Sequence, residues 1–144
     1  MFNRHSNVVN KLTVAFLIFV YFKFTLIIEK RGVKKMNIQV DLQESDKVLK
    51  GYVRGEIDAH TAPVLREKLE PYQNIESLNA ELDLSDVDYM DSTGLGVFVA
   101  FYKSVNSQGG HLKLSGLSAR LKRLFDITGL GDIMDIESAG KGGI

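Results

Sequence analysis

The stretch DVDYMDSTGLGVFVAFYKSV, residues 86–105, places acidic residues, a Ser-Thr pair and two glycines directly before an apolar run. Serine, threonine or aspartate before such a run is typical of a helix N-terminus, because a side-chain oxygen accepts from the free N–H groups there. We therefore expect a buried helix from about Thr93, capped by Asp91 or Ser92. The glycine pair at 109–110 is expected to end it.

Two interpretations of the paired hydroxyls remain open. In the first, they only cap the helix, and Gly94 and Gly96 let the helix approach a sheet closely. In the second, a hydroxyl at the helix N-terminus receives a phosphate, since free N–H groups favour a negative charge there. Phosphorylation would add about −1.5 to −2 charges at pH 7. The aspartates of this stretch, Asp86, Asp88 and Asp91, would make that patch strongly negative.

Two strands are expected before this helix. Residues 37–43, NIQVDLQ, alternate apolar and polar side chains, which is the period of a strand with one buried face. A turn at 44–47 and a second extended run at 48–57 complete a predicted hairpin. Gly51 and Gly55 in the second run favour a bulge or a close backbone approach.

A loop and helix follow at residues 58–72, with Thr61 as the expected N-cap. Pro63 stands in the first turn, where its missing N–H does no harm, and Pro71 ends the helix. Residues 80–87, AELDLSDV, are the third predicted strand and lead into the stretch quoted above.

The remaining elements continue the alternation of strand and helix. Residues 111–117 are a predicted strand, Ser118 is the expected N-cap of the next helix, and Gly129 its stop. A short last strand is expected within residues 132–138. Strands that alternate with single helices imply parallel pairing through crossovers. We therefore predict an α/β fold: one domain, with a small mixed β-sheet of about five strands and helices packed on it.

Composition excludes several functions. The chain has no cysteine, which removes disulfides, thiolate catalysis and cysteine-based metal sites. Residues 36–144 carry a net charge of −6, which argues against nucleic-acid binding by the body of the protein. Neither a G-x-S-x-G elbow nor a phosphate-binding GxxxxGK[ST] loop is present. The three histidines are separated in sequence, so no catalytic residue, metal site or cofactor is predicted; they are His5, His60 and His111.

Residues 1–35 form a hydrophobic, basic N-terminal extension with two open interpretations. The apolar run Leu12–Ile28 is near the lower length of a spanning helix, about 17 residues, so it could be a membrane anchor despite Lys23. Alternatively, the start site is assigned too early. Met36 opens the first predicted strand, and the preceding EKRGVKK is what a translated ribosome-binding site would encode. We favour the second interpretation, and with it the absence of a membrane association.

Three segments together carry a family resemblance. GEIDAHTAPVLREKL (55–69), DVDYMDSTGLGVFV (86–99) and SARLKRLFDITGLGDIMDI (118–136) resemble bacterial anti-sigma factor antagonists with a STAS domain, of the RsbV type. The resemblance implies a STAS domain over residues 36–137, followed by a flexible tail at 138–144.

The resemblance also implies a function in the cytoplasm. An unphosphorylated antagonist binds an anti-sigma factor that is a serine kinase, and the sigma factor is released; phosphorylation ends binding, and a serine phosphatase restores it. Ser92 is the implied acceptor and Thr93 the secondary one. The implied partner-binding residues are Gly55, Glu56, Ile57, Asp58, Met90, Asp91, Ser92, Thr93, Gly94 and Leu95.

Two other functions are kept as alternatives. The first is a STAS module tethered to a membrane through residues 12–28, acting in sensing or beside a transporter. The second is a nucleotide-binding or hydrolytic STAS domain, for which we expect no turnover. The leading hypothesis is a regulatory binding protein and not an enzyme.

Overall fold

The computed structural model describes residues 14–21 and 37–140, and the chain divides into two units, residues 1–35 and 36–144. In the first unit, residues 14–21 are helical and exposed. The rest of the predicted anchor, Leu12–Ile28, lies outside the described residues. Within the part of the chain that is described, no helix has the length and apolarity needed to cross a membrane.

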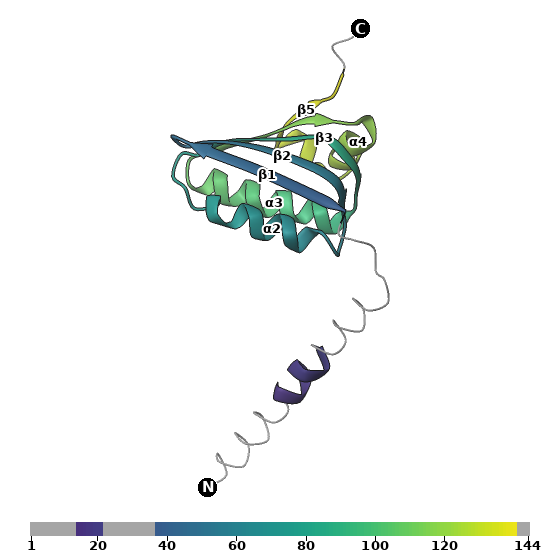
Figure 1. The fold of residues 1–144 in the computed structure, drawn as a ribbon. Coiled ribbons are helices and arrows are strands. Elements are labelled where there is room, and N and C mark those ends of the chain that lie inside the picture. Colours follow the sequence, from purple (N-terminus) through teal and green to yellow (C-terminus); the bar gives the residue numbers. More distant parts are fainter. Residues whose placement is uncertain (1–13, 22–36, 141–144) are drawn as a thin grey trace. The chain divides into compact units, whose positions relative to one another are not determined.

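The second unit is built on one five-stranded sheet (Figure 1). The strands are β1 (Ile38–Ser45), β2 (Val48–Ile57), β3 (Asn79–Met90), β4 (His111–Leu117) and β5 (Asp135–Ser138), and they lie in that order across the sheet. β1 and β2 form the predicted antiparallel hairpin, whereas β2, β3, β4 and β5 run parallel. The mixed sheet predicted from the alternation of elements is therefore confirmed.

The helices pack on one face of this sheet. They are α2 (Ala62–Leu69), α3 (Ser92–Ser107) and α4 (Ala119–Ile127), with short 3₁₀ turns at Glu70–Tyr72 (η1) and Leu130–Asp132 (η2). Figure 1 shows α2 and α3 side by side under the sheet. One core joins sheet and helices, with Phe98 of α3 and Phe125 of α4 both completely buried. Burial of each such side chain stabilises the fold by roughly 1.5–3 kcal/mol.

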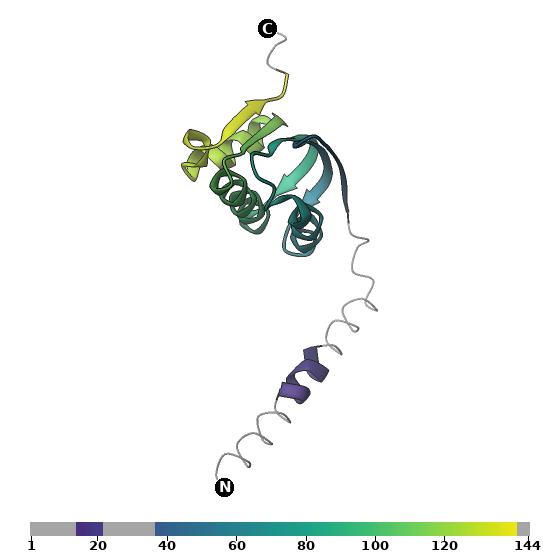
Figure 2. The same ribbon diagram turned by 90° about the vertical axis from the view of Figure 1, so that its left-hand side faces the viewer.

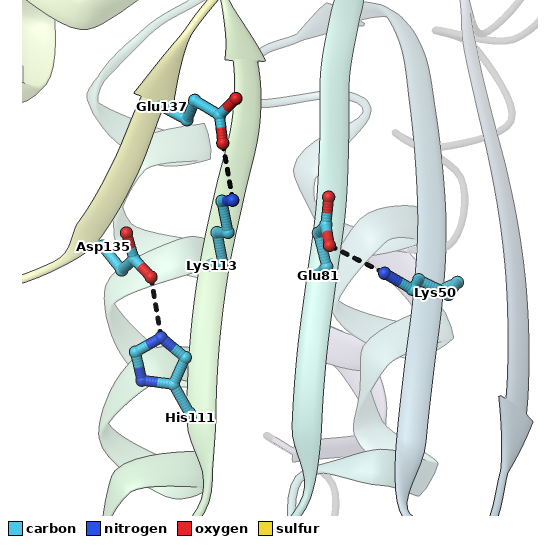
Figure 3. A network of polar contacts seen from close by, with 6 residues as sticks. All are labelled: Lys50, Glu81, His111, Lys113, Asp135 and Glu137. Carbon is cyan, nitrogen blue, oxygen red and sulfur yellow. Dashed lines mark hydrogen bonds and ion pairs between the residues drawn. The ribbon is translucent and has the colours of Figure 1, made fainter.

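The opposite face of the sheet is open and carries ion pairs between neighbouring strands, which Figure 3 shows from close by. Each pair is exposed and contributes only about 0–1 kcal/mol, so this face is a solvated surface and adds little to stability. The hydrogen bond from Lys50 lowers the pKa of Glu81, as expected for a carboxylate next to an ammonium group. The pairs are Lys50–Glu81, His111–Asp135 and Lys113–Glu137.

The glycines of β2 serve the close approach that the sequence predicts. Gly55 has φ +103°, and a Cβ there would lie 2.1 Å from the carbonyl oxygen of Asn37 at the start of the hairpin. The register between β2 and β3 shifts beside this residue, which is the predicted bulge.

Two element boundaries differ from the prediction. The third strand was expected to end at residue 87 and instead continues to Met90, because its last residues still pair with β2. At the C-terminus the sheet continues into the predicted tail, since Ser138 belongs to β5 and the N–H of Ala139 donates to the Leu117 carbonyl. Residues 141–144 lie outside the described residues.

Candidate functional site

The parallel pairing of β2 and β3 brings two distant motifs together. Ile57, the last residue of β2, is the register partner of Met90, the last residue of β3. The backbone N–H of Asp91 then donates to the Ile57 carbonyl over 3.1 Å. The loop after β2 and the N-terminus of α3 therefore lie side by side at the carboxyl edge of the sheet.

Asp91 caps α3, which decides between the two expected caps. Its carboxylate oxygen accepts from the backbone N–H of Thr93 at 2.8 Å and of Gly94 at 3.3 Å. Because Asp91 does this work, the hydroxyl of Ser92 is not needed for capping. Ser92 is the first residue of the helix and is exposed, and its hydroxyl makes no hydrogen bond to any described residue. The serine is thus available for chemistry from solvent.

The backbone beneath Ser92 packs directly on β2. A Cβ at Gly94 would lie 2.5 Å from Cγ2 of Ile57 and 3.0 Å from Cγ of Met90, so only glycine fits without movement. The same expectation for Gly96 is wrong, because a Cβ there would meet nothing within 4 Å. One glycine, and not two, sets the close approach of helix and sheet.

The neighbouring loop is held by reciprocal hydrogen bonds. The Asp58 carboxylate accepts from the backbone N–H of His60 at 2.8 Å and of Thr61 at 3.0 Å. Partial burial raises the pKa of Asp58, but these backbone N–H groups together outweigh it and the net pKa is lowered. The carboxylate is therefore ionised at neutral pH.

Thr61 also holds this loop, and the expectation that its side chain caps α2 is wrong. It stands at the N-cap position of α2, but its hydroxyl makes no cap hydrogen bond. Instead the hydroxyl donates to the carbonyl of Glu56 at 2.8 Å and accepts from the N–H of Asp58 at 2.9 Å. The side chain is 3% exposed, the one buried polar residue among those described. The spacing of three residues from Asp58 is the one sequence signal that the capping prediction did not use.

The predicted partner-binding residues divide into two groups. One group is buried and shapes the surface from beneath: Gly55, Ile57, Met90, Gly94 and Leu95. The other group is accessible to a partner: Glu56 and Asp58 from the first loop, and Asp91, Ser92 and Thr93 from the second.

The surroundings of Ser92 are acidic. Asp86 and Asp88 are exposed, and neither forms an ion pair or hydrogen bond with a described residue. Tyr89 is 46% exposed beside them, which sequence reasoning did not single out. Residues 37–140 and 14–21 contain no cluster of three or more His, Asp or Glu side chains arranged to hold a metal ion. The site is thus an exposed hydroxyl at a capped helix N-terminus, and the strand that leads to it carries two exposed carboxylates.

Comparison with known proteins shows which family the chain belongs to. The STAS domain family matches residues 39–140, so the chain belongs to that family. Within it, the chain is 53% identical over 109 residues to the anti-sigma-B factor antagonist of Bacillus subtilis, which covers 76% of this chain and 99% of that protein. It is 51% identical over 104 residues to the Listeria monocytogenes antagonist of the same name, covering 72% and 91%. These identities place it with the anti-sigma factor antagonists, as the resemblance in sequence predicted.

The fold comparison agrees. The crystal structure of an anti-sigma factor antagonist from Mycobacterium paratuberculosis superposes with a TM-score of 0.64 at 25% identity. That match covers 72% of this chain and 88% of the other.

Proposed function

We propose that the protein is an anti-sigma factor antagonist whose unphosphorylated form binds an anti-sigma factor, releasing a sigma factor, and that phosphate on Ser92 ends this binding. The observation that carries the proposal is the free hydroxyl of Ser92 on the first turn of α3, beside the locked loop of β2. The similarity to anti-sigma-B factor antagonists supports it independently.

The geometry accounts for a switch that needs no refolding. A phosphate on Ser92 would sit at the N-terminus of α3, where the helix dipole favours negative charge. It would also lie beside the capping carboxylate of Asp91, so the local negative charge would rise steeply. A partner surface that accepts a neutral hydroxyl would then meet a dianion, which costs several kcal/mol when like charges face one another.

The resemblance to anti-sigma factor antagonists implies the remaining partners. The anti-sigma factor acts as the serine kinase and brings its own ATP, and a separate serine phosphatase removes the phosphate. The antagonist itself is a substrate and a binding surface, and we expect it to catalyse nothing. Its action belongs in the cytoplasm, where sigma factors meet RNA polymerase.

The test incubates the full chain with the anti-sigma-B factor of Bacillus subtilis and ATP. Intact mass and peptide mapping then show how many phosphates are added and on which residue. We expect one phosphate per chain, located on Ser92, and none on Ser92→Ala. Thr93→Ala is the matched control, because it removes the neighbouring exposed hydroxyl and keeps the cap of Asp91. Stoichiometric phosphate on Ser92→Ala would overturn the assignment and make Thr93 the acceptor.

A further inference from the structure

β3 extends well past the strand that flanks it on one side. Its pairing with β4 ends at Asp83 and Ser115, whereas its pairing with β2 continues to Met90. Figure 2 shows the arrowheads of β2 and β3 lying together, apart from those of β4 and β5. Residues 85–90 therefore form a free edge inside the sheet, directly before the helix that carries Ser92.

The separation of β3 and β4 is built into the residues where it begins. The Asp83 carboxylate accepts the backbone N–H of Ser85 at 2.9 Å, so this N–H is satisfied without a carbonyl of β4. Opposite, Gly116 has φ +73°, and a Cβ there would lie 2.9 Å from the Asp83 carboxylate and from Cβ of Ser85. The Asp83 carboxylate and Gly116 therefore mark the point where the pairing of β3 with β4 ends.

The edge beyond this point presents backbone groups to solvent. The register of β3 on β2 shifts twice along this stretch, so β3 is bulged and a strict alternation of its N–H groups does not hold. On its side away from β2, residues 85–90 have no strand partner among the described residues. Such an edge is a template for an added strand. The Val87 side chain itself is 4% exposed and anchors the strand in the core.

The side chains of residues 85–90 determine which kind of segment can pair with this edge of β3. Asp86 and Asp88 are exposed and unpaired, and Tyr89 offers an accessible apolar ring. A second copy of the same edge would bring carboxylates together, which is unfavourable across neighbouring strands. A segment with Lys or Arg side chains would instead gain ion pairs with these exposed carboxylates.

We propose that the free edge of β3, residues 85–90, receives an extended basic segment of the anti-sigma factor as an added strand. This inference rests on the proposed function, because it makes the edge part of the same docking surface as Ser92. The segment would lie along β3 and lead the kinase to the hydroxyl at the strand's end. The edge thereby contributes recognition that the residues around Ser92 do not supply.

Amide hydrogen exchange of the full chain tests this, alone and with the Bacillus subtilis anti-sigma-B factor and ADP. We expect the amides of residues 85–90 to exchange at least about tenfold more slowly in the complex, because added strands protect edge amides. Protection confined to residues 55–58 and 91–95 would overturn the edge proposal and leave the proposed function standing. Failure to form any complex would overturn both.

A charge variant gives a second, independent readout. Asp86→Lys combined with Asp88→Lys should weaken binding by about tenfold or more, with a reduced salt dependence. Asp41→Lys is the matched control, since Asp41 is an exposed carboxylate on β1, at the far edge of the sheet. An equal effect of the control and the edge variant would contradict the proposal, as would unchanged affinity of the edge variant.

Discussion

The backbone N–H of Asp91 donates to the carbonyl of Ile57 over 3.1 Å, and this bond joins two segments separated by more than thirty residues of chain. Asp91 caps the helix of Ser92, and Ile57 ends the strand whose loop is locked by Thr61. Hydrogen bonds and short stretches of backbone therefore connect the buried Thr61 to Asp91, the residue before the proposed phosphate acceptor. A substitution at Thr61 is therefore expected to alter the N-terminus of α3, and a substitution at Asp91 to alter the loop after β2.

The first prediction concerns the cap. Asp91→Ala should lower the free energy of unfolding by about 1 kcal/mol, the usual cost of losing an N-cap side chain. Urea denaturation followed by circular dichroism measures it. Asp91→Asn keeps an acceptor oxygen for the N–H of Thr93 and should lose much less. Equal losses for the two variants would mean that the carboxylate charge, and not the cap hydrogen bond, stabilises the helix.

The second prediction concerns Thr61. Thr61→Val keeps the shape of the side chain but leaves the Glu56 carbonyl and the Asp58 N–H without their partner. We expect a loss of roughly 1–3 kcal/mol in unfolding free energy, since buried polar groups are left unsatisfied. Thr61→Ser retains the hydroxyl and should recover most of it in the same urea titration. Unchanged stability of Thr61→Val, together with a loss in Thr61→Ser, would show that methyl packing, and not the hydroxyl, matters.

The same pair of variants has a functional readout. Thr61→Val should also slow phosphorylation of Ser92 at a temperature where the variant is folded, because the loop beside the acceptor loses its anchor. Thr128→Val is the control, since its hydroxyl bonds to carbonyls at the end of α4. If both variants slow phosphorylation equally, the effect is general destabilisation.

The third prediction contrasts two glycines of α3. Gly94→Ala places a methyl group against Ile57 and should destabilise the fold by about 1–3 kcal/mol, as overpacking does. Gly96→Ala meets open space and should stabilise it by roughly 0.5–1 kcal/mol through helix propensity. Thermal unfolding of both variants checks the opposite signs. A stabilising Gly94→Ala would contradict the close approach of α3 to β2.

The fourth prediction concerns acid. The pKa of Asp58 is lowered in the folded protein, because backbone N–H groups outweigh the effect of its partial burial. The stability that this group contributes is therefore present above its unfolded pKa and is lost as pH falls through its folded pKa. Between about pH 5 and pH 2 the wild type should lose more stability than Asp58→Asn, measured as the urea midpoint. Parallel pH profiles would contradict this role.

The sequence predicts the order of elements and most of their bounds, because hydrophobic period and turn residues are local signals. The strand at 48–57 and the strand at 111–117 coincide with β2 and β4. The end of β3 was predicted three residues too early, because the predicted strand 80–87 stops before Asp88, and aspartate is uncommon in strands. The strand continues to Met90 because its pairing with β2 continues, and the side chains of Asp86 and Asp88 are exposed to solvent.

The sequence predicted the two motifs of the site, but not the contact between them. The register of β2 on β3 decides that Ile57 meets Asp91, and register depends on packing across the whole sheet. Thr61 is the clearest case, because threonine before a helix indicates a cap from local sequence alone. Its hydroxyl instead satisfies the carbonyl of Glu56, which only the folded loop brings within reach.

The most direct measurement is the affinity of the anti-sigma-B factor for this protein with and without phosphate on Ser92, by titration calorimetry. The account predicts measurable binding of the unphosphorylated chain and binding weaker by at least about 100-fold after phosphorylation, a change of roughly 2.7 kcal/mol. Equal affinities for the two forms would contradict the switch at Ser92.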